Sequence, residues 1–244
     1  MNKTKTIDVV DLVNNYINEE KRQDMKTELI FLGPPACGKG TQTTMLAEYL
    51  KLPHIDTGSL LRAEIKAETP AGIEAKFFID KGNLVPVELV SRIIRNRLQQ
   101  DDCKNGYILD GFPRSLEQAE QLTIINDEIN KNNSDVRFMA IYFDIDTNIL
   151  VKRIINRRSC PICGEIYNLE YKPPKVANKC DKDGAELIQR KDDTEEIAYK
   201  RFDTYNRETA PLIDYYSQKG VIKSIDANGS IEEVWERLLE VIKA

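Results

Sequence analysis

Short apolar runs alternate with longer segments of helical periodicity along most of the chain. Residues 28–32 form a run that stops at Gly33, which predicts a buried strand leading into a loop. Further apolar runs predict strands at residues 107–109, 139–143 and 221–225. Apolar positions at helical spacing predict helices at residues 41–50, 87–100, 115–130, 147–157 and 194–218. Because strands alternate with helices, we expect an α/β fold with a parallel sheet.

Residues 159–192 break this alternation. The segment contains three cysteines, several prolines and short alternating apolar groups, and it lies between two predicted helices. We therefore expect a small β-rich lobe, inserted between those helices.

Near the N-terminus, residues 6–23 place apolar side chains close to helical spacing, which predicts a short amphipathic helix. We expect an arm that packs on the core or is partly disordered, and binding to a partner or a lipid surface is the alternative. Residues 1–28 contain six acidic side chains and no apolar stretch of the signal-peptide type. A secretory signal or a mitochondrial transit peptide is therefore not expected.

The overall composition is typical of a soluble globular protein, with 41% hydrophobic and 31% charged residues among 244. A formal net charge of −5 disfavours a nucleic-acid-binding surface, which needs a basic face. No apolar run approaches the ~20 residues of a membrane span. The five cysteines are odd in number and three have metal-binding spacing, which argues against a disulfide framework. We expect a cytoplasmic protein without nucleic-acid or membrane partners.

A glycine-rich loop, GPPACGKGT, occupies residues 33–41 after the first predicted strand. Glycines let backbone N–H groups converge on an anion, and the N-terminus of the following helix favours negative charge. Lys39 supplies a positive charge for the β- and γ-phosphates of a nucleotide. The strict motif has a hydroxyl residue directly after the lysine, whereas here Gly40 separates Lys39 from Thr41. Strand, loop and helix in this order still predict a phosphate-binding loop, in which Cys37 is a small filler.

The other strong motif is a cysteine cluster. Cys160 and Cys163 form a Cys-x2-Cys knuckle, and Cys180 and Asp183 repeat its spacing with a carboxylate last. Four ligands with no open position predict a structural tetrahedral zinc site. The alternatives are a reduced, metal-free lobe and a redox-active cysteine pair, which lacks a thioredoxin-like context here.

Two polar segments stand where ligands can bind at the edge of a sheet: DGFPR at residues 110–114 and DTGSLLR at residues 56–62. In the first, Asp110 follows a predicted strand and can hold Mg²⁺, and Arg114 can clamp a phosphate. In the second, Thr57 and Arg62 can bind another anion. Taken alone, the first segment also fits an ordinary turn with a surface ion pair, and the second an ordinary helix cap.

Arginines bracket the cysteine-rich insert. Arg153 and Arg157 are four residues apart, which would place them on one face of the helix that enters it. Arg190 leaves the insert, and Arg201 lies about three turns along the exit helix. A lone surface arginine is usually solvated. Four arginines beside a phosphate loop instead predict a ring of positive charge that binds a polyphosphate. His54, the only histidine, is interpreted as structural.

Taken together, these motifs resemble the adenylate kinase family in its long-lid, zinc-bearing form. The resemblance covers residues 29–244 and rests on GPPACGKGTQ, DTGSLLR, DGFPR, Gln118, NLEYKPPK, the ligand spacing of the metal motif and QRKDD. It implies a P-loop core with two inserted lobes. The implied divisions are a core of residues 29–55, 86–155 and 194–244, an AMP-binding lobe of 56–85, a zinc-stapled lid of 156–193 and an N-terminal helical extension of 1–28.

The resemblance also implies the residues of each site, and Gln118 would recognise the adenine edge of AMP. The other AMP-binding residues would be Thr57, Arg62, Asn83, Leu84, Val85, Gly111, Phe112, Pro113 and Arg114. ATP and its Mg²⁺ would be bound by Ala36, Cys37, Gly38, Lys39, Gly40, Thr41, Asp110, Arg157, Ile166 and Tyr167. The transferring phosphoryl group would be surrounded by Lys39, Arg114, Arg153, Arg157, Arg190 and Arg201.

The implied reaction converts Mg-ATP and AMP to two ADP by direct in-line transfer, in adenine nucleotide homeostasis, and the implied enzyme is a monomer. Gln42 after the loop favours ATP as the donor. A GTP:AMP phosphotransferase stays open because the segment at Asn228–Gly229 matches the family's purine contact poorly. Ala36 stands where the family usually has glycine. An ATP-hydrolysing enzyme and a nucleic-acid-binding zinc module are more distant alternatives.

Overall fold

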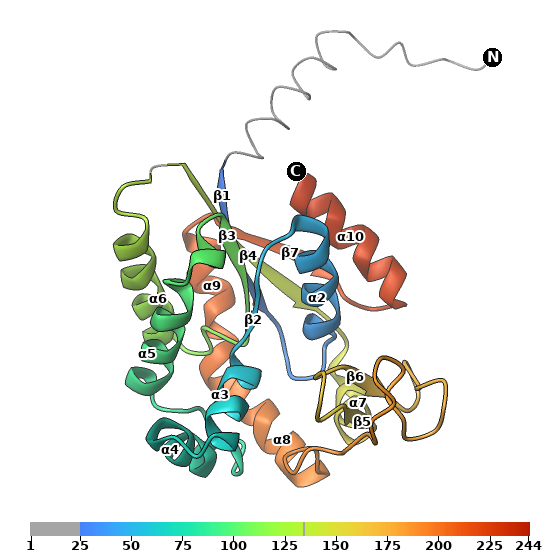
Figure 1. Ribbon diagram of the computed structural model, residues 1–244. Coiled ribbons are helices and arrows are strands. Elements are labelled where there is room, and N and C mark those ends of the chain that lie inside the picture. The colour runs from blue at the N-terminus through green and yellow to red at the C-terminus, as the bar shows by residue number, and fades with distance from the viewer. Residues whose placement is uncertain (1–24, 134) are drawn as a thin grey trace, which may run out of the picture.

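The computed structural model describes residues 25–133 and 135–244, so the helix predicted at 6–23 lies outside the described residues (Figure 1). Its centre is a five-stranded sheet with the order β2-β3-β1-β4-β7 and parallel pairing throughout. The strands are β1 (Lys26–Leu32), β2 (His54–Asp56), β3 (Gly106–Asp110), β4 (Val136–Asp144) and β7 (Ile222–Asp226). The predicted α/β fold with a parallel sheet is confirmed.

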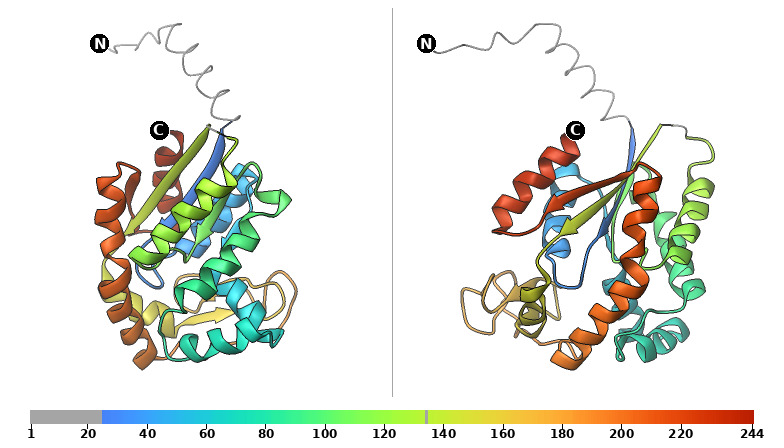
Figure 2. Two further views of the ribbon diagram at one scale, coloured as in Figure 1. Left: turned by 90° about the vertical axis from the view of Figure 1, so that its left-hand side faces the viewer. Right: turned by 180° about the vertical axis from the view of Figure 1, so that it is seen from behind.

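Helices cover both faces of this sheet (Figure 2). One face packs against α2 (Lys39–Leu50) and α10 (Ile231–Lys243), and the other against α5 (Val87–Leu98), α6 (Leu116–Ile129) and α9 (Pro211–Gln218). Successive side chains of a strand point to opposite faces. In β1, therefore, Leu29 and Phe31 join the α2–α10 side of the core, whereas Ile30 and Leu32 join the other side.

Two smaller groups of elements lie at the carboxyl end of the sheet (Figure 1). One is the pair α3 (Thr57–Lys66) and α4 (Pro70–Ile79). The other comprises α7 (Leu150–Ile155), β5 (Arg157–Ser159), β6 (Ile166–Asn168) and α8 (Glu195–Thr204). Short turns of helix complete the chain: 3₁₀ turns η1 (Asp101–Cys103) and η2 (Thr147–Ile149), and the π-helical η3 (Tyr205–Thr209). The two groups face each other across the carboxyl ends of the strands, where ligands bind in parallel sheets.

Most of the predicted elements are present. Three predicted strands lie inside β1, β3 and β4, and the fourth is offset from β7 by one residue. The predicted helices at 41–50, 87–100 and 115–130 correspond to α2, α5 and α6, with ends that differ by two residues or fewer. The DTGSLLR segment does contain a helix cap: α3 begins at Thr57, and the side chain of Asp56 caps it by accepting from Ser59 N.

One predicted helix was wrong in extent, and another is subdivided within its predicted range. The helix predicted at 147–157 is α-helical only over α7, and Arg157 lies in β5. The chain leaves the helix there because Arg157 pairs with Asn168 across the β5–β6 ladder, so Arg153 and Arg157 do not share a helix face. The helix predicted at 194–218 is divided into α8, η3 and α9, and α9 begins at Pro211, which has no N–H to continue the preceding helix.

One strand and two α-helices were not predicted: β2, α4 and α10. Strand β2 has only three residues, too few to show a period. The signal for α10 was present, because Ser230 and Glu233 form a capping box at its start. None of the helices in the described part of the chain combines the length and the apolar character that a membrane span needs.

The cysteine-rich insert contains little regular structure. Strands β5 and β6 form an antiparallel pair of three residues each, and isolated bridges such as Ser159–Ile188 extend it. Its buried apolar cluster consists of Cys160, Tyr167, Cys180 and Leu187.

Candidate active site and metal centre

A cavity of about 540 Å³ opens at the carboxyl edge of the sheet, between the glycine-rich loop, the α3–α4 pair and the insert. It is lined by the predicted residues Ala36, Cys37, Gly38, Lys39, Gly40, Thr41, Thr57, Arg62, Asn83, Leu84, Val85, Asp110, Gly111, Pro113, Arg114, Gln118, Arg153, Arg157, Ile166, Tyr167, Arg190 and Arg201. Phe112 is the exception among the predicted nucleotide-binding residues, because its side chain is buried in the core. The fold thus brings residues from distant parts of the sequence to one cavity.

The glycine-rich loop turns sharply into α2. Gly38 caps the helix with a left-handed backbone, φ 98°, where a side chain would be strained. Ala36 is also left-handed, with φ 62°, a conformation that costs an alanine roughly 1–2 kcal/mol. A side chain added at Gly40 would approach Asp110 Oδ2 at 3.6 Å. The loop therefore places backbone close to the Asp110 carboxylate.

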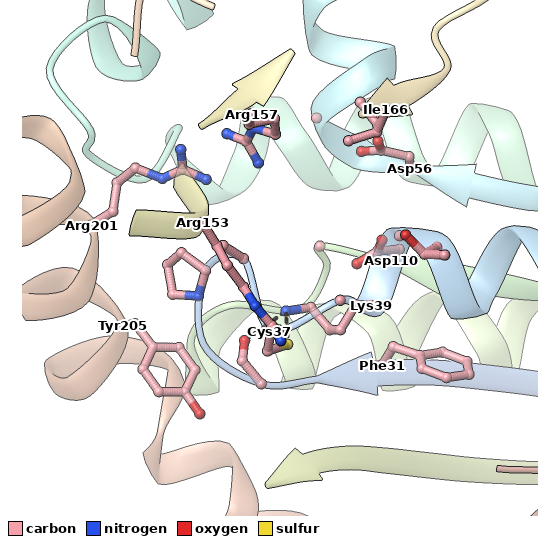
Figure 3. A pocket seen from close by; sticks show the side chains of 18 of the residues that line it. Phe31, Cys37, Lys39, Asp56, Asp110, Arg153, Arg157, Ile166, Arg201 and Tyr205 are labelled. Carbon is pink, nitrogen blue, oxygen red and sulfur yellow. Dashed lines mark hydrogen bonds between the residues drawn. The ribbon is translucent and has the colours of Figure 1, made fainter. Parts of the chain in front are cut away.

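Lys39 contacts the loop itself in this structure. Its ammonium group donates to the carbonyl oxygens of Gly33, at 2.7 Å, and Pro34, at 3.1 Å, and lies 3.3 Å from Cys37 Sγ (Figure 3). Cys37 is 2% exposed and belongs to the buried cluster on the α2 side of the core, as expected of a small filler. An ammonium group has three donors, so Lys39 must exchange loop contacts to bind phosphate oxygens.

On the α3 side of the cavity, Asp56 and Ser59 hold the guanidinium of Arg62 in place. Asp56 accepts from Ser59 Oγ at 2.9 Å, and Arg62 Nη2 donates to the same Ser59 Oγ at 2.9 Å. The neighbouring Thr57 hydroxyl is buried and has no hydrogen-bond partner among the described residues. Buried hydroxyl groups are usually hydrogen-bonded, so Thr57 beside Arg62 is suited to receive a polar ligand from the cavity.

Gln118 lies on the first turn of α6 and lines the same cavity. Its Oε1 accepts from Arg114 N at 2.8 Å, which fixes the orientation of the amide. Arg114 is itself held, because its Nε donates to Gly111 O at 2.8 Å and its carbonyl accepts from Thr209 Oγ1 at 2.7 Å. Gln118 is 3% exposed and still lines the cavity, so it can present a fixed amide to a ligand.

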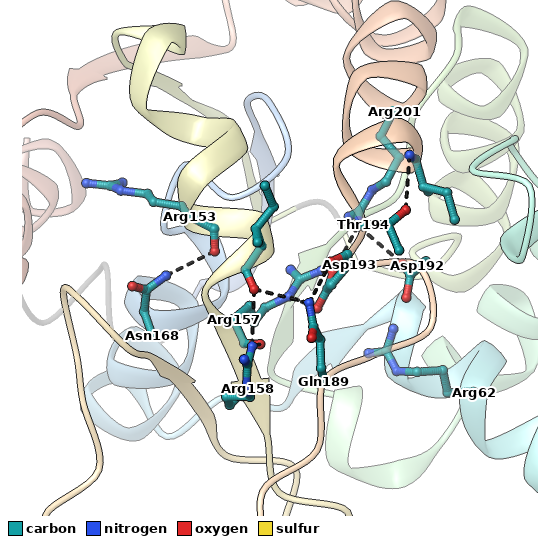
Figure 4. Close-up of polar contacts among 12 residues, drawn as sticks. Arg62, Arg153, Arg157, Arg158, Asn168, Gln189, Asp192, Asp193, Thr194 and Arg201 are labelled. Atoms are coloured by element: carbon teal, nitrogen blue, oxygen red, sulfur yellow. Dashed lines mark hydrogen bonds and ion pairs between the residues drawn. The ribbon is translucent and has the colours of Figure 1, made fainter. Parts of the chain in front are cut away.

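On the insert side, arginines share two carboxylates (Figure 4). Arg157 makes a bidentate pair with Asp193, which is completely buried. Arg201 Nη1 lies 3.2 Å from Asp192 Oδ2 and 3.6 Å from Asp193 Oδ1. Burial opposes the charge of Arg157, but the bonds to Asp193 raise its pKa above the ordinary value.

For the other arginines around the cavity, burial lowers the pKa more than nearby carboxylates raise it. Burial, together with repulsion from Arg157, lowers the pKa of Arg190 to about 9 and that of Arg201 to about 10. Burial also lowers the pKa of Arg62, which faces Arg157 and Arg114. A polyanion that enters the cavity would relieve the repulsion among these positive charges, so its binding is favourable.

Arg153 is not part of the group formed by Arg157, Arg190 and Arg201. Its guanidinium lies over the ring of Tyr171, 4.8 Å from the centroid, and its Nε is buried without a hydrogen-bond partner in the described ranges. Figure 4 shows Arg153 directed away from Arg157 and Asp193. Tyr171 was not among the predicted site residues, although it lies within the NLEYKPPK motif.

Asp110 ends β3, directly beside Asp56 at the end of β2. It is 8% exposed, and His54 Nε2 lies 3.9 Å from its Oδ2. His54 also lies 2.9 Å from Thr43 Oγ1, so it ties β2 to α2, consistent with a structural role. A carboxylate next to a phosphate-binding loop is the kind of oxygen ligand that Mg²⁺ uses in nucleotide sites.

The predicted metal ligands come together in the insert. The ligand atoms of Cys160, Cys163, Cys180 and Asp183 all lie within 4.8 Å of one another. Backbone N–H groups of Ile162 and Cys163 point at Cys160 Sγ, each at 3.4 Å, as in a zinc knuckle. Zinc with ligands at about 2.0–2.3 Å separates neighbouring ligand atoms by somewhat less than 4 Å. The four side chains therefore fit a tetrahedral zinc ion after small adjustments.

Comparisons with known proteins agree with this geometry. A family model described as "Adenylate kinase" matches residues 31–221. The adenylate kinase of Thermodesulfovibrio yellowstonii is 47% identical over 215 residues, which cover 88% of this chain and 98% of the relative. The adenylate kinase of Archaeoglobus fulgidus is 48% identical over 88% of this chain and 99% of the relative. That of Clostridium kluyveri is 43% identical over 89% of this chain and 98% of the relative. The chain therefore belongs to the adenylate kinase family.

Proposed function

We propose that this adenylate kinase binds ATP and AMP at opposite ends of the cavity at the carboxyl edge of the sheet and transfers the phosphoryl group directly between them. The observation that carries the proposal is the arrangement of charge. The glycine-rich loop with Lys39 stands at one end, Thr57 and Arg62 stand at the other, and Arg157, Arg190 and Arg201 line the insert side. No covalent intermediate is needed, because positioning and charge neutralisation account for catalysis of this reaction class.

In this proposal each nucleotide has its own contacts. Residues 36–41 with Arg157, Ile166 and Tyr167 bind ATP, and Thr57, Arg62 and the backbone of residues 83–85 bind AMP. Gln118 recognises the adenine edge of AMP. The arginines around the insert, with Lys39 and Arg114, stabilise the negative charge of the transferring group. Arg153 is proposed to contribute from its place over Tyr171, on the donor side of the cavity.

The proposed metals have different places and roles. Asp110 is the residue placed to hold Mg²⁺, directly or through water, and this ion neutralises charge on the β- and γ-phosphates when it is bound with ATP. Zinc is proposed in the insert, bound by Cys160, Cys163, Cys180 and Asp183. The zinc ligands leave no open position, so its proposed role is structural.

We also propose that the core, the AMP-binding lobe and the lid implied by the resemblance are separate structural parts of the enzyme. Residues 156–193 are a lid and 56–85 an AMP-binding lobe, both attached to the core of 29–55, 86–155 and 194–244. Closure of a lid over the reacting groups excludes water, which would otherwise divert the transfer to hydrolysis. The enzyme is proposed to act as a monomer in the cytoplasm, a reducing compartment suited to thiolate ligands.

A nucleotide-pair screen with product identification tests the proposal. Purified protein with Mg²⁺ is incubated with ATP or GTP as donor and with AMP, GMP, CMP or UMP as acceptor, and every nucleotide product is quantified. We expect two ADP for each ATP and AMP consumed. Release of inorganic phosphate from ATP without AMP would indicate hydrolysis and contradict the proposal. The comparisons give no support to GTP as the preferred donor, and the GTP arm checks this directly.

A further inference from the structure

The two segments that join the insert to the core are bridged by one amide side chain. We call these segments the neck: residues 155–157 lead into the insert, and residues 189–193 lead out of it. Gln189 Nε2 donates to Asp193 O at 2.8 Å and to Ile155 O at 3.2 Å, so its amide spans both segments (Figure 4). Gln189 belongs neither to the proposed nucleotide sites nor to the proposed zinc ligands.

The carbonyl of Ile155 needs a donor from outside its own helix. Ile155 is the last residue of α7, and the last carbonyls of a helix lack intrahelical partners. The N–H that could continue the helix to this carbonyl, that of Ser159, donates to Ile188 O instead. Arg158 Nη1, at 3.1 Å, and Gln189 Nε2 donate to Ile155 O, and both side chains belong to the insert. The insert therefore caps α7, and Gln189 ties this cap to the exit segment of the neck.

The two bridged carbonyls stand next to a buried ion pair at the cavity. Ile155 lies two residues before Arg157, and Asp193 is itself the carboxylate that pairs with Arg157. Asp193 is completely buried, and Arg157 lines the cavity. Gln189 is exposed to solvent, so it holds the backbone of both partners from outside the cavity. Because the net contribution of one such hydrogen bond to stability is small, we expect its main effect to be on geometry.

We infer that Gln189 is a positioning residue, which holds the Arg157–Asp193 pair in register across the neck and so directs the Arg157 guanidinium at the transferring phosphoryl group. Charge that stabilises a transition state must be held in place before the reaction, and small misplacements of such groups are costly in rate. Gln189 touches no substrate in this arrangement and acts through Arg157. The inference rests on the proposed function, in which Arg157 is one of the residues around that phosphoryl group.

The first arm of the test compares Gln189→Met, Gln189→Lys and a control, Lys182→Met. Methionine keeps the length of the glutamine side chain but has no donor, whereas the ammonium group of lysine can donate to both carbonyls. We expect the single-turnover rate of ADP formation to fall about tenfold in Gln189→Met and by less than about threefold in Gln189→Lys. KM for ATP and for AMP should change by about twofold or less, since the loss is confined to the transition state. Lys182→Met removes an ion pair with Glu165 elsewhere in the insert and should leave the rate unchanged.

The second arm is a double-mutant cycle with Asp193→Asn, which keeps the shape of the side chain but removes its charge. In this background Gln189→Met should lower the single-turnover rate by less than about twofold, because the ion pair that Gln189 aligns is already weakened. The melting temperature of Gln189→Met alone should stay close to that of the wild type, since its side chain is exposed. A purely structural role predicts the opposite, a lower melting temperature with an unchanged rate well below it.

An unchanged rate in a folded Gln189→Met protein would overturn the inference, as would an equal loss of rate in Lys182→Met. A loss in Gln189→Lys as large as that in Gln189→Met would also overturn it, because the donors of the amide would then not be what matters. Full additivity in the cycle would show that Gln189 acts independently of Asp193. If Asp193→Asn does not fold, the comparison of Gln189→Met with Gln189→Lys decides. A wild-type enzyme that forms no ADP from ATP and AMP would refute the proposed function instead, so the two failures are distinguishable.

Discussion

The sheet core and the cysteine-rich insert are stabilised in different ways. The core contains two extended clusters of buried apolar side chains, one on each face of the sheet, with Ile30 and Ile141 completely buried. The insert has four buried residues in its cluster, and two of them, Cys160 and Cys180, are proposed metal ligands. Burial of apolar surface therefore suffices for the core, whereas the insert needs other ties.

Those other ties are visible around the proposed zinc ligands. Glu165 pairs with both Lys172 and Lys182, and the Tyr167 hydroxyl accepts from Asp181 N at 2.7 Å. Each such contact is modest in free energy when exposed to water. A segment with little apolar burial can open locally while the core stays folded. The insert and the core thus depend on different contacts, so we expect that the stability of each can be changed separately.

The largest effect is expected from truncating a core side chain. Ile141→Ala should lower the free energy of unfolding by about 2–5 kcal/mol, because it removes a fully buried side chain and leaves a cavity. Leu187→Ala in the insert should change the free energy of global unfolding much less and should instead speed proteolysis of residues 156–193. Denaturant titration and limited proteolysis of both variants provide the measurement. Equal losses of global stability would show that the two regions unfold as one.

The next largest effect concerns Lys39, at the core side of the cavity. Lys39→Ala should reduce kcat about 100-fold or more, since it removes a preorganised positive charge at the phosphates. The melting temperature should change little, because Lys39 contacts only its own loop in the described structure. Lys104→Ala is a matched control at an exposed lysine on the far side of the core. Turnover near the wild-type level in a folded Lys39→Ala protein would contradict the assigned role.

Removing the metal should loosen the insert before it affects the core. Elemental analysis of protein prepared without added metal should give about one zinc per chain, and chelation should increase proteolysis within residues 156–193. Cys160→Ser should lose zinc and lower the melting temperature, with weaker activity retained at low temperature. Cys103→Ser, at a buried cysteine distant from the cluster, should keep the zinc. Protein without zinc would refute the proposed metal site. So would an insert that is cleaved at the same rate with and without the chelator.

The smallest expected effect is on the choice of acceptor base. Gln118→Ala should reduce the preference for AMP over GMP in kcat/KM by about tenfold, because its fixed amide no longer pairs with the adenine edge. Gln121→Ala, three residues further along α6 and outside the cavity lining, is the control. Neither variant should change the zinc content or the protease sensitivity of the insert. Discrimination equal to wild type in Gln118→Ala would remove this residue from the proposed AMP site.

Local patterns predicted much of the fold and many of the cavity residues. The apolar run of β1, the glycine-rich loop and the start of α2 are contiguous, so their sequence carries the strand, turn and helix signals together. The missed elements had weaker signals: β2 is only three residues long, and α10 had a capping box that the sequence analysis did not use. The error at Arg157 arose because helical periodicity continued past the residue at which the chain pairs with β6.

The sequence by itself determined which chemical groups the protein has and the order in which they occur. The spacing of Cys160, Cys163, Cys180 and Asp183 was enough to predict a metal site, because each pair lies on one tight turn whose geometry is local.

Only the tertiary structure decided which groups meet. Arg157 pairs with Asp193, 36 residues away in sequence, and Gln42 contacts Ile231, 189 residues away. No local period encodes these pairs, since they depend on how the insert and α10 pack against the rest of the fold. Within residues 25–133 and 135–244, the same packing leaves Thr57 and Gln42 each with a buried side-chain oxygen that has no hydrogen-bond partner. Burial and partner choice are properties of the assembled structure, because they depend on every segment that surrounds a group.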